Sequence, residues 1–204
     1  MNIHRSRFTA IVLAFTFAVA LTAAAVRPAG AEGMTTTSKT GSWFIGLGVG
    51  GGTAGLTQNG TTSKRETAPS ASFRVGYDMT SMLSLGIQTN GWRKSEKDAS
   101  NNDVATTFSV TTATIFYHPP AANGLELRGG VGLGTGDASI ASGGTTLSES
   151  QSGFGFNLGA GYGFPVGRSF SIGPTVDFGW MTLKDFDANF VNFGVAFDWR
   201  SMAR

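Results

Sequence analysis

The 204-residue chain contains no cysteine, which excludes disulfide bonds and thiolate zinc sites. Charged residues make up only 14% of the sequence, against about a quarter in ordinary soluble domains. After Val26 there is no continuous apolar stretch that could cross a membrane as a helix. The composition therefore fits neither a disulfide-stabilised secreted domain, nor a typical water-soluble globule, nor a helical membrane protein.

The N-terminal segment is typical of an export signal. Two arginines precede an apolar run from Phe8 to Val26, and a small-x-small triplet ends at Ala31. We expect cleavage between Ala31 and Glu32, which leaves a short polar tether (residues 32–41) before a single domain (residues 42–204). A retained membrane helix is the alternative, because the run approaches the length that a bilayer requires. The alanine-rich end of the run and the triplet favour removal.

Removal of this segment also changes the charge balance. The segment holds three arginines and no acid, so the remaining chain has 12 basic residues against 13 acidic ones. Recognition of nucleic acid would need a basic face on the folded domain. The high isoelectric point of the whole chain therefore does not predict a nucleic-acid partner.

The last segment, Asn189 to Trp199, shows a two-residue period. A β-strand sends alternate side chains to opposite faces, so this period predicts a strand with one apolar and one small or polar face. The apolar face comprises Val191, Phe193, Val195, Phe197 and Trp199; the other comprises Asn192, Gly194, Ala196 and Asp198.

Seven more segments are predicted as strands, and turns and loops of alternating length join all eight. The chain has 30 glycines, many of them on the less apolar face of these strands. One segment, Val104–Tyr117, leaves its orientation open, because either a bulge shifts its register or one face is mixed. Pro174 is expected to weaken another, since proline removes a ladder hydrogen bond. The predicted strands are Ser42–Gly52, Ser70–Asp78, Leu83–Asn90, Val104–Tyr117, Leu125–Gly134, Phe154–Tyr162, Phe170–Leu183 and Asn189–Trp199; the long loops are Thr53–Pro69, Arg93–Asp103 and Gly136–Ser150.

An even number of strands of about ten residues, with short turns on one side, predicts an all-β fold: an eight-stranded antiparallel up-and-down transmembrane β-barrel. A secreted lipocalin-like barrel would also alternate, but it would need charges along its water-facing side. Here the less apolar side is mainly glycine, serine and asparagine, which suits a narrow interior, so we expect the apolar side to face lipid. Aromatic residues near the short-turn ends could form an interfacial girdle: Trp43, Tyr77, Tyr162, Phe170 and Trp199.

The closing strand carries a polar-x-Gly-x-x-aromatic-x-aromatic spacing at Asn192, Gly194, Phe197 and Trp199. This spacing resembles the C-terminal signal by which bacterial outer-membrane β-barrels are assembled, although here Arg200–Arg204 follow the last aromatic residue. With the export signal and the eight strands, the chain resembles the small outer-membrane barrels, such as the OmpA membrane domain and OmpX-like proteins. The resemblance implies an outer-membrane location, contact with membrane lipid and lipopolysaccharide, use of the assembly machinery and a monomeric state.

Polar residues on the inward side form the most informative set. Charges inside a narrow barrel should be paired, because desolvating an isolated charge costs several kcal/mol. We therefore expect Arg74 or Arg128 to pair with Asp177 or Glu126 and to help close the pore. A water-filled passage is the competing interpretation. The full predicted network is Arg74, Gln88, Glu126, Arg128, Asn157, Asp177 and Asp198.

The sequence offers little catalytic chemistry. Gly46–Gly51 fits G-x-G-x-x-G, but no helical pattern follows it, so a nucleotide site is not expected. His118 is the single histidine after the signal and lies in a predicted turn away from the long loops, and Asp185 with Asp187 is too sparse for calcium. We expect no metal and no cofactor. The favoured function is a non-catalytic structural, adhesion or surface-recognition barrel whose long loops meet an unknown extracellular ligand; the alternatives are a narrow diffusion channel and, third, a lipid-modifying enzyme.

Overall fold

The computed structural model describes residues 41–58, 60–98, 102–142 and 145–201. The predicted signal peptide and its cleavage site between Ala31 and Glu32 lie outside these residues. No helix that is long and apolar enough to cross a membrane occurs in the described part of the chain. The strands there are β1 (Trp43–Gln58), β2 (Thr61–Thr62), β3 (Glu66–Asp78), β4 (Leu83–Lys97), β5 (Asp103–Tyr117), β6 (Leu125–Ser142), β7 (Thr145–Tyr162), β8 (Phe164–Val166), β9 (Phe170–Thr182) and β10 (Asp187–Arg200).

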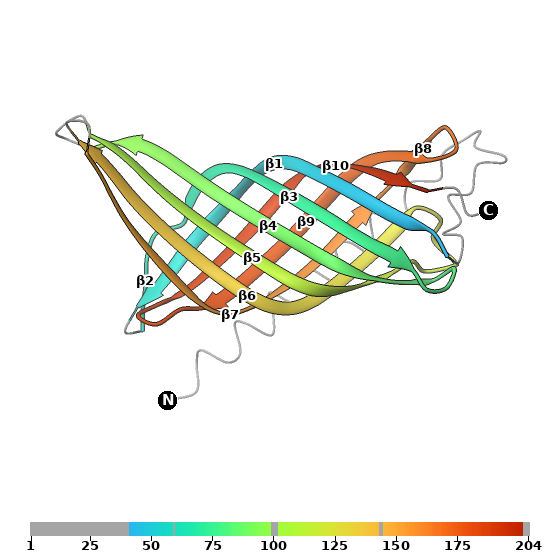
Figure 1. Cartoon of the computed structure of the whole chain (residues 1–204), viewed down its shortest axis with the longest axis horizontal. Coiled ribbons are helices and arrows are strands. Elements are labelled where there is room, and N and C mark those ends of the chain that lie inside the picture. The colour runs from blue at the N-terminus through green and yellow to red at the C-terminus, as the bar shows by residue number, and fades with distance from the viewer. Residues whose placement is uncertain (1–40, 59, 99–101, 143–144, 202–204) are drawn as a thin grey trace. The chain divides into compact units, whose positions relative to one another are not determined.

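Eight long strands form one closed antiparallel sheet (Figure 1). Each pairs with its neighbour in the chain, and β10 pairs with both β9 and β1, so the sheet has no open edge through the barrel wall. The two short strands are additions, since β2 pairs with β1 and β8 with β9. The predicted eight-stranded antiparallel barrel is confirmed.

The strands are longer than the sequence pattern predicts. The segments 53–69, 93–103 and 136–150, predicted as loops, are mostly paired strand, and β6 and β7 each reach 18 residues. The prediction of long loops was wrong for two reasons. Residues 146–150 are exposed throughout, and a strand with water on both faces needs no alternation of apolar and polar residues. In residues 53–58 the buried residues are the small Ala54 and Gly55, which give little apolar signal. We call the side with these connections the long-hairpin end and the opposite side the short-turn end.

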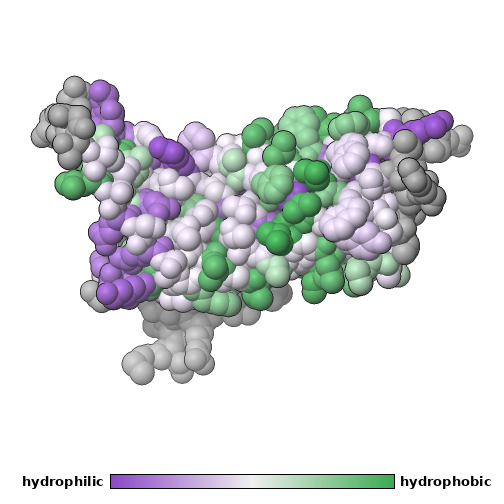
Figure 2. Space-filling view, in the orientation of Figure 1, coloured by the Kyte–Doolittle hydropathy of each residue, from purple (hydrophilic) through white to green (hydrophobic). Residues whose placement is uncertain are grey.

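The apolar side chains lie on the outside of the barrel. Val131 and Leu133 of β6 are 59% and 66% exposed, whereas Arg128 on the same strand is 4% exposed. In Figure 2 the hydrophobic residues gather over the part of the barrel nearer the short turns, and hydrophilic residues lie at the long-hairpin end. The outward apolar band and the buried polar residues suit a barrel surrounded by lipid.

The orientation of β5, which the sequence left open, is settled by its register. β5 pairs with β4 without interruption from Leu83 opposite Tyr117 to Lys97 opposite Asp103, so there is no bulge. Phe108 and Phe116 are buried inside, while Ile115 and Tyr117 are exposed outside. One face of this strand is therefore mixed, with phenylalanine and threonine together in the lumen.

Pro174 does not end β9. The ladder between β7 and β9 stops at Gly161 opposite Thr175, and β8 begins to pair with β9 at Ile172. On this side of β9 Pro174 lies between the two ladders, a position that tolerates the missing N–H, and on the other side it stays opposite Val195 of β10. The strand consequently runs through the proline.

The narrow lumen requires glycine at positions that face large inward side chains of neighbouring strands. A Cβ added at Gly46 would overlap the Asp198 carboxylate and the Arg74 guanidinium, and one at Gly159 would overlap Asp177 and Arg128. These glycines thus make room for the charged side chains. The G-x-G-x-x-G stretch lies within β1, and the described residues after it contain strands and no helix.

The long-hairpin half of the lumen holds an apolar cluster, which was not expected from the sequence. Trp92 stacks on Phe108 at 5.7 Å between ring centroids, and its indole N–H donates to the Gly52 carbonyl at 3.1 Å. Outside Trp92 and Phe108 the wall is polar, with Arg93 opposite Thr107, whereas outside Phe190 it carries Phe178 and Val191. The buried members are Ala54, Ala68, Trp92, Phe108, Val110, Met181, Leu183, Ala188 and Phe190.

We expect Phe108→Ala to lower the free energy of unfolding by about 3–5 kcal/mol, because a buried ring leaves a cavity in a rigid surround. Phe193→Ala is the matched control: its ring is 57% exposed on the outward face, where lipid fills the space that the ring leaves. Urea unfolding in detergent micelles or lipid vesicles measures both. Equal losses would contradict the apolar cluster as a packed core.

Candidate functional site in the barrel lumen

Arg128 of β6 lies at the centre of the lumen, and its side chain is fully buried. It binds the Asp177 carboxylate of β9 with two parallel hydrogen bonds, Nε to Oδ1 at 2.9 Å and Nη2 to Oδ2 at 2.7 Å. Nη2 also donates to the Thr175 hydroxyl, and Nη1 donates to Glu126 at 2.9 Å. Arg128 thus ties β6 to β9 through a bidentate pair, the strong form of such contacts.

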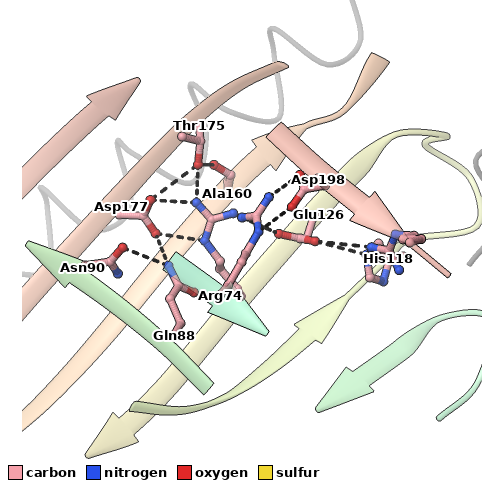
Figure 3. Close-up of polar contacts among 11 residues, drawn as sticks. Arg74, Gln88, Asn90, His118, Glu126, Ala160, Thr175, Asp177 and Asp198 are labelled. Atoms are coloured by element: carbon pink, nitrogen blue, oxygen red, sulfur yellow. Dashed lines mark hydrogen bonds and ion pairs between the residues drawn. The ribbon is translucent and has the colours of Figure 1, made fainter. Parts of the chain in front are cut away.

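Arg74 of β3 makes the second bidentate pair, with Asp198 of β10. Nε donates to Oδ1 at 2.8 Å and Nη2 to Oδ2 at 2.5 Å, while Nη1 lies 3.1 Å from Glu126 Oε1. Glu126 is therefore shared by two arginines from different strands (Figure 3). The result is one continuous ionic chain across β10, β3, β6 and β9.

The amide side chains of the predicted network split into two groups. Gln88 Nε2 donates to Asp177 Oδ1 and to Asn90 Oδ1, both at 3.0 Å, so Gln88 belongs to the ionic chain. Asn157 is buried, but its Oδ1 accepts from the Thr112 hydroxyl at 2.8 Å. The structure thus brings six of the seven predicted residues into one chain and places Asn157 beside it.

Three further charged or titratable residues extend this chain to the short-turn end, and none of them belongs to the network predicted from the sequence. Arg200 Nη1 lies 2.8 Å from both carboxylate oxygens of Asp78, a fully buried residue that also accepts from the Ser84 hydroxyl at 2.5 Å. His118 Nε2 lies 3.2 Å from Glu126 Oε2 and 3.0 Å from Arg200 Nη2. A signal was present: Arg200 continues the inward parity of Asp198, but the predicted strand ended one residue too early.

A cavity of about 260 Å³ lies at the short-turn end, next to this part of the network. Its lining includes Arg74, His118, Glu126, Asp198 and Arg200, together with the turn around Pro119 and Pro120. Beyond it, toward the long hairpins, the ionic chain and then the apolar cluster occupy the lumen. The arrangement can hold strands together and restrict passage.

Candidate metal ligands are sparse in the part of the chain that the structure describes, where no group of three or more His, Asp and Glu could hold an ion. Asp185 instead accepts a hydrogen bond from Gln151 at 2.8 Å. The residues of the predicted assembly signal occupy both faces of β10. Asn192 is buried and donates to the Gly91 carbonyl at 3.3 Å, Gly194 packs against the β1 backbone, and Phe197 and Trp199 are exposed outside.

A closed eight-stranded barrel with an apolar exterior and a charged lumen defines the class of small transmembrane β-barrels. Consistent with this, the sequence model of the outer membrane protein beta-barrel domain matches residues 11–198. The chain belongs to this family and is an integral protein of the outer membrane. No curated protein matches it.

Two similar solved structures, both of Ail, show the same fold. Ail, the attachment invasion locus protein of Yersinia pestis, crystallised with the heparin analogue sucrose octasulfate, is 16% identical with a TM-score of 0.60, covering 78% of this chain and 99% of Ail. Another Ail structure gives 17% identity over the same shares, with a TM-score of 0.57. Neisserial surface protein A is 13% identical over 76% of this chain and 97% of its own, with a TM-score of 0.48.

We expect Asp177→Ala to lower the free energy of unfolding by about 3–5 kcal/mol, because it leaves a buried guanidinium without its bidentate partner. Asp185→Ala, at a long hairpin, is the matched control and should cost far less. A double-mutant cycle with Arg128→Met measures the coupling between Arg128 and Asp177. An Asp177→Ala protein with unchanged thermal stability would argue against a structural role for the network.

Proposed function

We propose that the protein is a non-catalytic surface-recognition barrel that acts through its long-hairpin end, on the extracellular side. The observation that carries this proposal is a four-stranded sheet, β4 to β7, that continues above the barrel rim (Figure 1). The β3–β4 ladder ends at Trp92 and the β7–β9 ladder at Phe154. A membrane strand needs only about 9–11 residues, so the remainder of these strands is available for contacts outside the bilayer.

The projecting sheet offers two kinds of contact. Residues 145–150 of β7 have β6 on one side and no described strand on the other, so their backbone groups can pair with an extended partner. Near the tip, Ile140 and Leu147 pair across β6 and β7 and are 46% and 73% exposed. Apolar side chains held in water on a rigid sheet suit a recognition surface.

Arg65, between β2 and β3, supports contact with lipopolysaccharide. Its Nη1 and Nη2 donate to Asn189 Oδ1 at 2.5 Å and to the Thr53 carbonyl at 2.6 Å, and partial burial lowers the pKa of its guanidinium. No carboxylate within the described ranges forms an ion pair with it. A fixed cation beside the outward face, just above the apolar band, is suited to bind a lipid phosphate.

The other interpretations have less support. A diffusion channel would need a continuous passage, but the ionic chain and the apolar cluster together fill much of the lumen. An enzyme would need an activated group, and the nitrogen of His118 that has partners contacts Glu126 and Arg200, neither of which carries a hydroxyl or thiol for the ring to deprotonate. We further propose a monomer that the outer-membrane assembly machinery inserts after reading Asn192, Gly194, Phe197 and Trp199.

The recognition role can be tested by shortening the β6–β7 hairpin. Residues 138–149 are replaced with Asn-Gly, a two-residue turn that suits the Asp137–Ser150 pair. Cells that display the shortened protein should lose adherence to cultured animal cells and to immobilised heparin, while a boiled and unboiled gel comparison still shows a folded barrel. Ile140→Ser with Leu147→Ser should produce a partial loss. Unchanged adherence of both variants would contradict the proposal.

Planar-bilayer recordings on the same proteins address the channel alternative. The parent and the shortened protein should both lack long, reproducible open states. Such open states in the parent protein would favour the diffusion channel and would contradict the proposed recognition role of the projecting sheet.

We expect Trp199→Ala to reduce the amount of folded barrel in the outer membrane, because it removes the last aromatic residue of the assembly signal. Trp43→Ala is the matched control: Trp43 lies at the same end on the adjacent strand and is also exposed outside. The folded fraction is read from the mobility difference between boiled and unboiled samples. Equal losses in the two variants would indicate a general interfacial role for tryptophan.

A further inference from the structure

His118 holds two contacts through one nitrogen atom. Nε2 lies 3.0 Å from Arg200 Nη2 and 3.2 Å from Glu126 Oε2, while Nδ1 is buried and has no partner among the described residues. The ring is therefore held through Nε2. Its side chain is 19% exposed and lines the cavity at the short-turn end, so protons can reach it from water.

These two contacts cannot both be hydrogen bonds at the same time. Arginine is always a donor, so a bond from Arg200 requires a lone pair on Nε2 and therefore a neutral ring with its proton on Nδ1. A carboxylate is an acceptor, so a bond to Glu126 requires a proton on Nε2. A doubly protonated ring satisfies Glu126 and repels the Arg200 guanidinium.

The net charge of the surrounding network favours binding of one more proton by His118. The cations of the described lumen network are Arg74, Arg128 and Arg200, and its carboxylates are Asp78, Glu126, Asp177 and Asp198. With a neutral His118 the network has one negative charge in excess, and a charged ring balances it. An unbalanced charge in a poorly solvated interior is costly.

Charged groups from three strands, β3, β6 and β10, surround the ring. Glu126 of β6 attracts the charged form, and Arg200 of β10 opposes it. Arg74 and Arg128 compete for the same Glu126 carboxylate, whereas Asp78 and Asp198 offset Arg200 and Arg74. Histidine is the side chain whose charge ordinarily changes between pH 5 and 8.

We propose that His118 is a proton-operated contact at the short-turn mouth of the barrel. The neutral ring accepts a hydrogen bond from Arg200 and holds the Arg200 side chain beside the ionic chain. When the ring takes up a proton, Nε2 stops accepting from Arg200 and donates to Glu126 instead. Arg200 then keeps its hydrogen bonds to Asp78 and loses its hydrogen bond to the His118 ring. The His118 ring, which borders the cavity, thereby changes its hydrogen-bond partner with pH.

Nitrogen-15 NMR of the full chain in micelles tests this exchange. His118 is the single histidine after the predicted signal, so its ring gives the only histidine signal of the processed protein, and His4→Gln gives the same result where the signal is retained. Above its titration the ring should carry its proton on Nδ1, and below it both nitrogens should be protonated. The guanidinium signals of Arg200 should shift with the same midpoint, whereas those of Arg168, an exposed arginine at the same end, should not.

Arg200→Gln provides a second, independent prediction. Without the guanidinium, the neutral ring should move its proton to Nε2 and donate to Glu126, so the tautomer at high pH reverses. A parent ring that is already protonated on Nε2 when neutral, or Arg200 signals that stay fixed while the ring titrates, would overturn the proposal. Should Arg200→Gln fail to fold, these two measurements on the parent decide it.

Discussion

The narrow interior of an eight-stranded barrel is the constraint on which the rest of the structure depends. Such a lumen is just wide enough for side chains to fill, so it has little room for water around a charge. Each arginine inside must therefore meet carboxylates directly, as Arg128 meets Asp177 and Glu126. The same constraint accounts for Gly46 and Gly159, where any side chain would displace one of these ion pairs.

The content of the lumen changes along the barrel axis. Near the short turns the interior is ionic, whereas toward the long hairpins Trp92 and Phe190 enter the interior. The wall outside Trp92 is polar, with Arg93 opposite Thr107, but the wall outside Phe190 still carries Phe178 and Val191. A sheet that projects from the rim is stabilised where its inward side chains form an apolar core. The apolar cluster supplies that core and supports the sheet that projects from the rim.

The two-residue period sufficed to predict eight strands and their outward faces, because segments such as Phe154–Tyr162 have lipid on one side only. It failed for residues 136–150, where water on both faces removes the alternation. The sequence was enough to predict that the charged residues inside the lumen form ion pairs, since buried charges need partners. That Glu126 serves both Arg74 and Arg128 could not be predicted, because it depends on how the register and tilt of the sheet place β3 relative to β6.

Arg200 shows why the chain does not stop at its last aromatic residue. Its backbone N–H donates to the Ser169 carbonyl, and Ser201 and Trp43 exchange two hydrogen bonds across the seam between β10 and β1. Its guanidinium lies over the Phe44 ring at 5.1 Å and reaches Asp78 at the end of β3. One residue beyond Trp199 thus joins the last strand to the first and anchors the ionic chain at the mouth.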